Sequence, residues 1–191
     1  MKILGIDLAG SEKRKTGICL MDKKLNAKCQ ILFKDREILN LIEKEKPDLI
    51  AIDAPLSLPK RRKNLRRAKI HFRKCDRELW KFGIKFFPIT LGPMRALTKR
   101  GIKLRKILEK KYKVIEVYPG ASQDLLKIPR KGKGIKKLFR GLKKLGIKGL
   151  RKDLTDDELD AITSAYTGLL YLKKGFIAIG SKKEGQIILP K

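Results

Sequence analysis

Hydrophobic and polar positions divide the first 53 residues into short strands and one helix. Nearly continuous apolar residues predict a buried strand over residues 3–8, and similar runs predict strands over residues 16–21 and 28–33. Apolar residues at helical spacing predict a helix over residues 36–46, and residues 49–53 predict a fourth, buried strand. The pattern therefore indicates an antiparallel meander of three strands, followed by a helix-linked strand.

The middle of the chain changes to a basic pattern with apolar residues at helical intervals. It predicts one helix over residues 64–82, closed by Gly83, and another over residues 96–111. The segments Phe86-Phe87-Pro88 and Gly92-Pro93 are typical of loops. We expect these helices to form a basic insertion at about residues 56–112.

The last third begins with a fifth predicted strand over residues 114–118, ended by Pro119-Gly120. Residues 127–152 contain no acid, and five apolar residues there fall on one helical face: Ile135, Leu138, Phe139, Leu142 and Leu145. Thr155 and Glu158 form a capping-box pattern that predicts the start of a helix over residues 154–172. A terminal hairpin is predicted from two short apolar runs at 176–179 and 186–189.

The order of these elements predicts the fold class. Three meandering strands followed by helix-linked strands are typical of an α/β protein with the RNase H-like mixed sheet. A length of 191 residues suits one domain over the whole chain, with the helical insertion as part of it.

The net charge of the chain predicts the kind of partner that it binds. The chain has 49 Lys and Arg against 20 Asp and Glu, a net charge of +29. Such an excess favours a polyanionic partner, and DNA or RNA ranks above an anionic membrane because the basic 127–152 segment contains no Trp. A merely solvated basic surface is the alternative. No aromatic stacking platform for single strands stands out in the sequence.

The content of other residue types disfavours several kinds of site and of protein. Three cysteines without paired spacing and one histidine, His71, leave little basis for a zinc site or a histidine-centred triad. No apolar run reaches the length of a membrane span, and the start reads as a strand, so we expect a cytoplasmic protein. Richness in lysine with few Asn and Gln is typical of a thermophilic source.

Acids at strand ends are the main candidates for chemistry. Asp7 and Asp53 each close an apolar strand, Glu116 lies within the fifth, and Asp157 and Asp160 are three apart on one helix side. Buried carboxylates are costly unless paired or bound to metal, and converging ones suit Mg²⁺ or Mn²⁺. Two such ions can hold the attacking water and the leaving oxygen of a phosphodiester. We therefore predict catalytic roles for all five acids.

Each acid also has a structural alternative. Asp7 and Asp53 could be turn-forming residues, and Glu116 could pair with a lysine on an exposed strand face. Glu158 is best explained as the capping-box residue and Asp156 as a first-turn acid that helps the helix dipole; Asp157 could have the same role as Asp156. Asp160 lies beyond the first turn, so the helix dipole explains it less well.

A set of motifs in chain order resembles an uncharacterised family of predicted RNase H-like nucleases. The segments are Gly5-Ile6-Asp7-Leu8-Ala9-Gly10, Ile52-Asp53-Ala54-Pro55-Leu56, Arg73-Lys74-Cys75-Asp76-Arg77-Glu78-Leu79, Glu116-Val117-Tyr118-Pro119-Gly120 and Asp157-Glu158-Leu159-Asp160-Ala161. The resemblance spans nearly the whole chain. The family is in turn similar to Holliday-junction resolvases of the RuvC and YqgF type, which carry Glu where this chain has Asp53.

The resemblance implies that Asp7, Asp53, Asp157 and Asp160 are metal ligands. It also implies that Arg73, Asp76 and Arg77 lie at the rim of the site. Nucleic-acid contacts are expected from seven basic residues: Arg73, Arg77, Lys131, Lys133, Lys136, Lys137 and Arg140.

The leading hypothesis is a divalent-metal-dependent nuclease that hydrolyses phosphodiesters in DNA or RNA. The alternative is a non-catalytic nucleic-acid-binding protein with the same fold. A phosphotransferase of the actin and sugar-kinase superfamily ranks last, because 191 residues leave no room for a second copy of the fold. Resolvases act as dimers, but no coiled-coil seam is visible, so monomer and homodimer both stay open.

Overall fold

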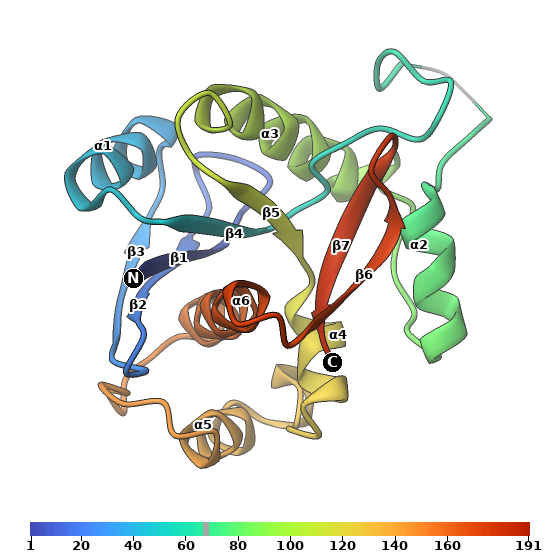
Figure 1. The fold of residues 1–191 in the computed structure, drawn as a ribbon. Coiled ribbons are helices and arrows are strands. Elements are labelled where there is room, and N and C mark those ends of the chain that lie inside the picture. The colour runs from blue at the N-terminus through green and yellow to red at the C-terminus, as the bar shows by residue number, and fades with distance from the viewer. Residues whose placement is uncertain (67–68) are drawn as a thin grey trace.

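A seven-stranded mixed sheet forms the centre of the protein. The computed structural model describes residues 1–66 and 69–191 (Figure 1). The strands are β1 (Lys2–Asp7), β2 (Thr16–Asp22), β3 (Ala27–Leu32), β4 (Leu49–Asp53), β5 (Val114–Val117), β6 (Phe176–Ser181) and β7 (Gly185–Pro190). Their order across the sheet is β3-β2-β1-β4-β5-β7-β6.

Strand direction follows the sequence-based prediction. Strands β1, β2 and β3 form an antiparallel meander, whereas β1, β4, β5 and β7 run parallel to one another. Strands β6 and β7 form the terminal hairpin, with β6 antiparallel at the edge. The predicted mixed sheet is therefore confirmed, and each strand begins and ends within two residues of its predicted position.

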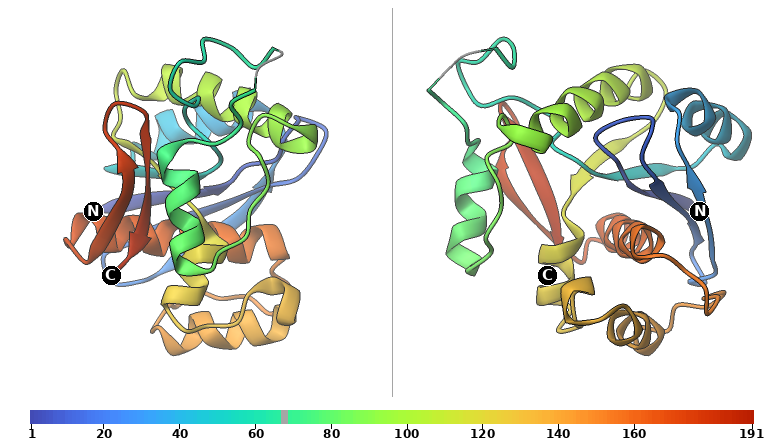
Figure 2. Two further views of the ribbon diagram at one scale, coloured as in Figure 1. Left: turned by 90° about the vertical axis from the view of Figure 1, so that its right-hand side faces the viewer. Right: turned by 180° about the vertical axis from the view of Figure 1, so that it is seen from behind.

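Helices cover both faces of the sheet. They are α1 (Asp35–Glu45), α2 (Lys74–Leu79), α3 (Gly92–Leu108), α4 (Pro119–Leu125), α5 (Ile135–Lys144) and α6 (Asp156–Leu172), with short 3₁₀ turns η1 (Trp80–Phe82) and η2 (Lys131–Lys133). Helices α1 and α3 lie on one face, whereas α6 lies on the other with α4 and α5 beyond it (Figures 1 and 2). Helix α2 packs beside the β6–β7 hairpin.

The alternation of side chains along each strand decides which acids share a face. Ile3 of β1 and Ala51 of β4 belong to the core beneath α6, whereas their neighbours Leu4 and Ile52 belong to the core beneath α1 and α3. A strand has a side-chain period of two. Asp7, four residues after Ile3, therefore lies on the α6 face.

Helix α6 approaches the sheet closely because glycines line the facing strands. A Cβ added at Gly5 would lie 2.1 Å from the carbonyl oxygen of Ala161, and one at Gly17 would lie 2.0 Å from that of Asp157. Only glycine fits at such distances from a backbone. The backbone of α6 at Asp157 and Ala161 therefore packs directly on the sheet.

The helical insertion differs from the prediction at its first helix. Helix α2 begins at Lys74, ten residues after the predicted start, although it ends as expected before Gly83, which has a positive φ of 68°. The guanidinium of Arg62 donates hydrogen bonds to the carbonyl oxygens of Asn64, Arg66 and Ile70. These bonds hold the preceding residues in a loop, and the prediction of helix there was wrong for the residues that the structure describes.

Two prolines also mark helix starts where loops or a strand end were predicted. Helix α3 begins at Gly92-Pro93, and α4 begins at Pro119 directly after β5. Proline is well suited to the first turn of a helix because its missing N–H is unpaired there in any case. Reading these prolines only as breaks in the pattern missed α4 and four residues of α3.

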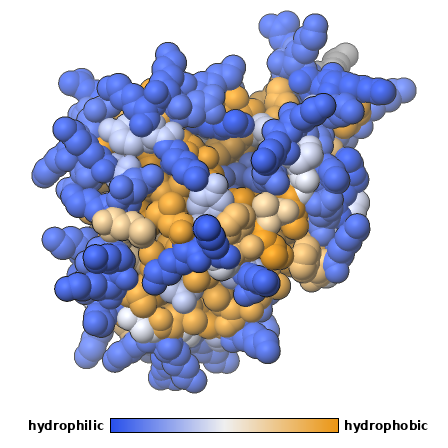
Figure 3. All heavy atoms as spheres, viewed as in Figure 1, coloured by the Kyte–Doolittle hydropathy of each residue, from blue (hydrophilic) through white to orange (hydrophobic). Residues whose placement is uncertain are grey.

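Hydrophilic side chains dominate the outline of the face seen in Figure 1, around a hydrophobic centre (Figure 3). In the whole chain, Lys and Arg outnumber Asp and Glu by 49 to 20. Among the described residues, no helix is both long and apolar enough to cross a membrane.

Candidate metal centre and nucleic-acid surface

Asp7 and Asp53 are neighbours at the carboxyl edge of the sheet. They end the adjacent parallel strands β1 and β4 and are paired in register. Both follow runs of fully buried apolar residues, so the strands bring both carboxylates to the same point. Ligand sites in open α/β sheets lie outside the carboxyl ends of such strands.

The first turns of α6 bring two further acids to this edge. Thr155 caps the helix, since its hydroxyl accepts the Glu158 N–H at 3.2 Å and Glu158 accepts the Thr155 N–H at 2.9 Å. These hydrogen bonds confirm the predicted capping box and with it the structural role of Glu158. Asp157 and Asp160 then lie on the side of α6 that meets the sheet, and Asp160 is almost completely buried.

Mutual repulsion shows that these acids form one cluster. Burial, and after it the charges of Asp160 and Asp157, raise the pKa of Asp7 to about 8 against a lowering effect of Lys131. Burial likewise raises the pKa of Asp53, with Asp7 and Asp160 as the next contributors. The pKa of Asp157 is also raised, by burial and then by Asp156. Neighbouring carboxylates disfavour one another's charged forms in this way.

One lysine partly compensates the cluster. The Lys131 ammonium lies 2.8 Å from an Asp160 carboxylate oxygen and 3.4 Å from one of Asp156. On its other oxygen, Asp160 accepts a 2.7 Å hydrogen bond from the buried Gln123 amide. Burial disfavours the charge of Lys131, but the surrounding acids outweigh this effect and raise its pKa.

The four aspartates are suitable ligands for a hard divalent cation, whose charge would offset their repulsion. Four carboxylates supply only oxygen ligands, which Mg²⁺ and Mn²⁺ prefer. Among residues 1–66 and 69–191, however, no three His, Cys, Asp or Glu side chains are already arranged around a common ion position. Metal binding would therefore require side-chain rotation and displacement of the Lys131 ammonium from Asp160.

Glu116 does not join the four aspartates. Asp53 is in register with Val117, so Glu116 lies one residue away and points to the opposite face of the sheet. Its carboxylate accepts two hydrogen bonds of 2.6 Å from Arg73 and one of 2.8 Å from the Leu56 N–H. The structure therefore places Glu116 in a buried ion pair, instead of the catalytic position expected from the sequence.

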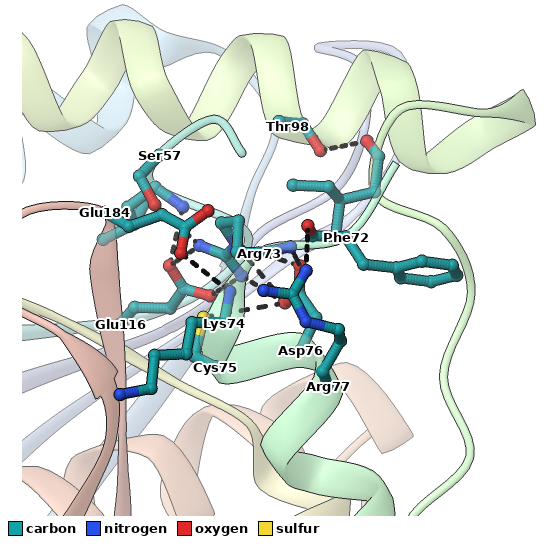
Figure 4. Close-up of polar contacts among 12 residues, drawn as sticks. Ser57, Phe72, Arg73, Lys74, Cys75, Asp76, Arg77, Thr98, Glu116 and Glu184 are labelled. Atoms are coloured by element: carbon teal, nitrogen blue, oxygen red, sulfur yellow. Dashed lines mark hydrogen bonds and ion pairs between the residues drawn. The ribbon is translucent and has the colours of Figure 1, made fainter. Parts of the chain in front are cut away.

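Arg73 is likewise buried, although it was expected to contact nucleic acid. Its side chain is 1 % exposed, and besides Glu116 it binds Asp76 at 2.7 Å and the Ser57 hydroxyl at 2.9 Å (Figure 4). All its guanidinium nitrogens are thus used inside the protein. Arg73 and Asp76 connect α2 to the end of β5, which corrects their assignment to the rim. Arg77 is exposed, and it donates a hydrogen bond to the Phe72 carbonyl.

The other predicted nucleic-acid contacts remain at the surface. Lys133 in η2 and Lys136, Lys137 and Arg140 in α5 are all exposed. Helix α5 is anchored through Leu138 and Leu142, which belong to the core under α6. Because η2 also carries Lys131, this basic segment begins at the aspartate cluster and extends away from it.

Sequence reasoning missed Gln123 and underestimated Lys131. Gln123 lies on the unpredicted helix α4, so no local pattern connected it with Asp160. Lys131 was expected only to bind nucleic acid, because one lysine in a basic segment carries no sign of its partners. Both contacts depend on tertiary packing of α4 and η2 against α6.

Comparison with known proteins shows the family of the chain and agrees with its fold. Residues 5–175 match the family model described as "Protein of unknown function (DUF429)", and the chain belongs to this family. No curated protein matches the chain. Two solved structures of the Thermus thermophilus resolvase are similar to it along most of their length.

The first is described as "T. thermophilus RuvC in complex with Holliday junction substrate". It has a TM-score of 0.51 and 14 % identity, covering 92 % of this chain and 96 % of that one. The second, "Thermus thermophilus RuvC structure", has a TM-score of 0.52 and 13 % identity, covering 92 % and 97 %. At such identities the likeness establishes the fold, and the predicted RNase H-like fold is confirmed.

Proposed function

We propose that this member of the DUF429 family is a divalent-metal-dependent nuclease that hydrolyses phosphodiester bonds in DNA or RNA. The observation that carries the proposal is the convergence of Asp7, Asp53, Asp157 and Asp160 at one edge of the sheet. Burial and the charges of neighbouring acids raise the pKa of Asp7, Asp53 and Asp157 there. A cluster that is unfavourable in the resting protein is typical of a site that binds a cation during function.

The four aspartates would hold Mg²⁺ or Mn²⁺, and the bound ions would activate water and neutralise charge on the phosphate. Asp7 and Asp53 stand on rigid neighbouring strands, which limits their movement. Gln123 fixes the orientation of Asp160 through its amide. Lys131, once separated from Asp160, is positioned to bind a phosphate oxygen of the same strand.

The basic segment supplies the affinity for the substrate. Lys133, Lys136, Lys137 and Arg140 continue from the cluster along η2 and α5, so a phosphate backbone can follow them. One of the two similar RuvC structures is a complex with a Holliday junction substrate. We include four-way junctions with single strands and duplexes of DNA and RNA among the substrates to test.

The test is cleavage of end-labelled nucleic acids in the presence of Mn²⁺. Asp7→Asn should reduce the rate on the order of 10³-fold, since a bound metal supplies several kcal/mol of stabilisation to the transition state. It should retain nucleic-acid binding. The control is Asp48→Asn, because Asp48 is exposed and lies before β4, at the opposite edge of the sheet. Equal cleavage by wild type and Asp7→Asn would refute the proposal.

A second function, nucleic-acid binding without cleavage, is favoured by one observation. Lys131 already occupies Asp160, and the described acids are not arranged around an ion position. Under this alternative, Mn²⁺ would neither produce cleavage nor stabilise the protein. Binding would still weaken steeply with salt, because Lys and Arg contacts release counterions from the phosphates.

A further inference from the structure

An apolar cavity lies beside the aspartate cluster, on the side of the helical insertion. Its volume is about 530 Å³, within the range of sites that bind small organic groups. Asp53 lines it together with Glu116 and Arg73, so the cavity begins at a proposed metal ligand. The remaining walls come from α2, α3, the segment between them and the ends of β5 and β7.

The walls of the cavity suit a flat aromatic ring. Phe86, Phe87 and Tyr118 line it, with Met94 and Leu79 as further apolar contacts. Three of the charged residues that line it, Arg73, Asp76 and Glu116, are paired with one another (Figure 4). Among the described residues, every buried side-chain nitrogen and oxygen has a hydrogen-bond partner. Apart from Asp53, which belongs to the aspartate cluster, and Lys85, the cavity therefore offers mainly apolar and π surfaces.

The aromatic walls are assembled from separate segments. Phe86 stacks on Trp80 with ring centroids 5.7 Å apart, and Phe72 meets both rings edge-on. Phe87 is 76 % exposed and unusually large for a side chain left in water. This cluster of three rings, which no local pattern predicted, adjoins the cavity through Phe86.

Positive charge around the cavity favours an anionic ligand. Lys85 lines the cavity, and Lys81 and Arg95 are exposed on the neighbouring η1 and α3. A second copy of this chain would bring another +29 charges and is disfavoured by repulsion. A nucleic-acid strand combines an anionic backbone with flat bases. A base inside a duplex is stacked, however, so only an unpaired or extruded base can present its face.

We propose that this cavity receives an unpaired nucleobase of the strand whose phosphodiester lies at Asp7 and Asp53. The inference rests on the proposed nuclease function for the position of that strand, and it specifies the substrate as nucleic acid with unpaired bases close to the scissile bond. Asp53 contacts both regions, so the base and the phosphate belong to the same or adjoining nucleotides.

The experiment compares two fluorescein-labelled DNA duplexes, one with a single unpaired base and one with an abasic residue at the same bulge. Wild type should bind the first about tenfold more tightly, as expected for one base stacked on aromatic side chains. Anisotropy is measured without divalent cations, so a failure of cleavage does not affect the result. A loss of nuclease activity with the base preference retained would refute only the nuclease proposal.

Two variants test the location of the base. Phe87→Ala removes an exposed wall, and Met94→Trp fills the cavity; both should abolish the tenfold difference while leaving affinity for the abasic duplex unchanged. Phe82→Ala, an exposed aromatic residue outside the cavity, should keep the preference. Equal affinities in wild type would overturn the proposal, as would a preference that survives in Phe87→Ala. Competition by a free mononucleotide at the same concentration as the bulged strand would also overturn it.

Discussion

Two groups of buried acids lie on opposite faces of the same sheet edge, and they differ in how their charge is balanced. Around Glu116, burial raises the pKa, but the Arg73 guanidinium opposes this effect and donates two short hydrogen bonds. Around Asp7, burial also raises the pKa, and the next contribution, from Asp160, adds to it. The first group is neutralised within the protein, whereas the second is compensated only in part, by Lys131. Under the proposed function, a divalent cation supplies the missing positive charge.

This comparison separates structural from functional acids by their partners. A buried carboxylate with a bidentate arginine fixes the position of the elements that carry it. Carboxylates that repel one another cost stability and are retained where a ligand offsets the cost. Glu116 and Asp53 are one residue apart in register, so the sheet pleat alone places them on opposite faces.

The largest expected effect comes from breaking the buried ion pairs of Arg73 with Glu116 and Asp76. Arg73→Met should lower the free energy of unfolding by about 3–5 kcal/mol, because Glu116 and Asp76 would remain buried without a cation. Urea denaturation measures this change. Arg77→Met is the matched control; its side chain is exposed, and its effect should stay within about 0.5 kcal/mol. Similar losses in both variants would contradict the assignment of Arg73 to a structural ion pair.

The aspartate cluster should respond to pH with a definite sign. Asp7 keeps its proton up to about pH 8 in the folded protein but loses it near its ordinary pKa of 3.8 when unfolded. The folded state therefore binds more protons between these values, and stability falls as pH rises through this window. Asp7→Asn should reduce this slope by up to about 1.4 kcal/mol per pH unit and should be more stable than wild type at pH 8.

Urea denaturation at a series of pH values between 4 and 9, without metal, measures this effect. Asp22→Asn serves as the control, because hydrogen bonds from Asn26 lower the pKa of Asp22 and move its titration below the window. Its slope between pH 5 and 8 should equal that of wild type. An Asp7→Asn variant that is less stable than wild type at pH 8 would show that the carboxylate is balanced in the resting protein.

The smallest expected effect comes from removing Lys131, which pairs with Asp160 less completely than Arg73 pairs with Glu116. Lys131 is 43 % exposed, and its removal should cost about 1 kcal/mol or less. In Lys131→Met, Mn²⁺ should bind about fivefold more tightly than in wild type, because the ammonium no longer competes for Asp160. Calorimetric titration measures the affinity. Mn²⁺ should not restore the stability lost in Arg73→Met, and weaker Mn²⁺ binding in Lys131→Met would contradict a competing role.

The local pattern was reliable where one physical rule decides the outcome. Apolar runs in β1 and β4 and the capping box at Thr155 predicted their elements and the presence of acids at their ends. The pattern failed where long-range contacts compete with propensity. Arg62 holds the residues before α2 in a loop through three carbonyl groups, and no periodicity in that segment reveals them.

By itself, the sequence determined the strands and most helices in chain order, because strand and helix periodicity is a local property. Its motifs indicated the RNase H-like class and the candidate acids Asp7, Asp53, Asp157 and Asp160. Only the tertiary structure decided that Glu116 and Arg73 neutralise each other and that Lys131 enters the cluster. It also assembled the aromatic cavity from α2, α3 and β5. Strand register and the packing of distant segments create these contacts, and a one-residue difference in register reverses the face of a side chain.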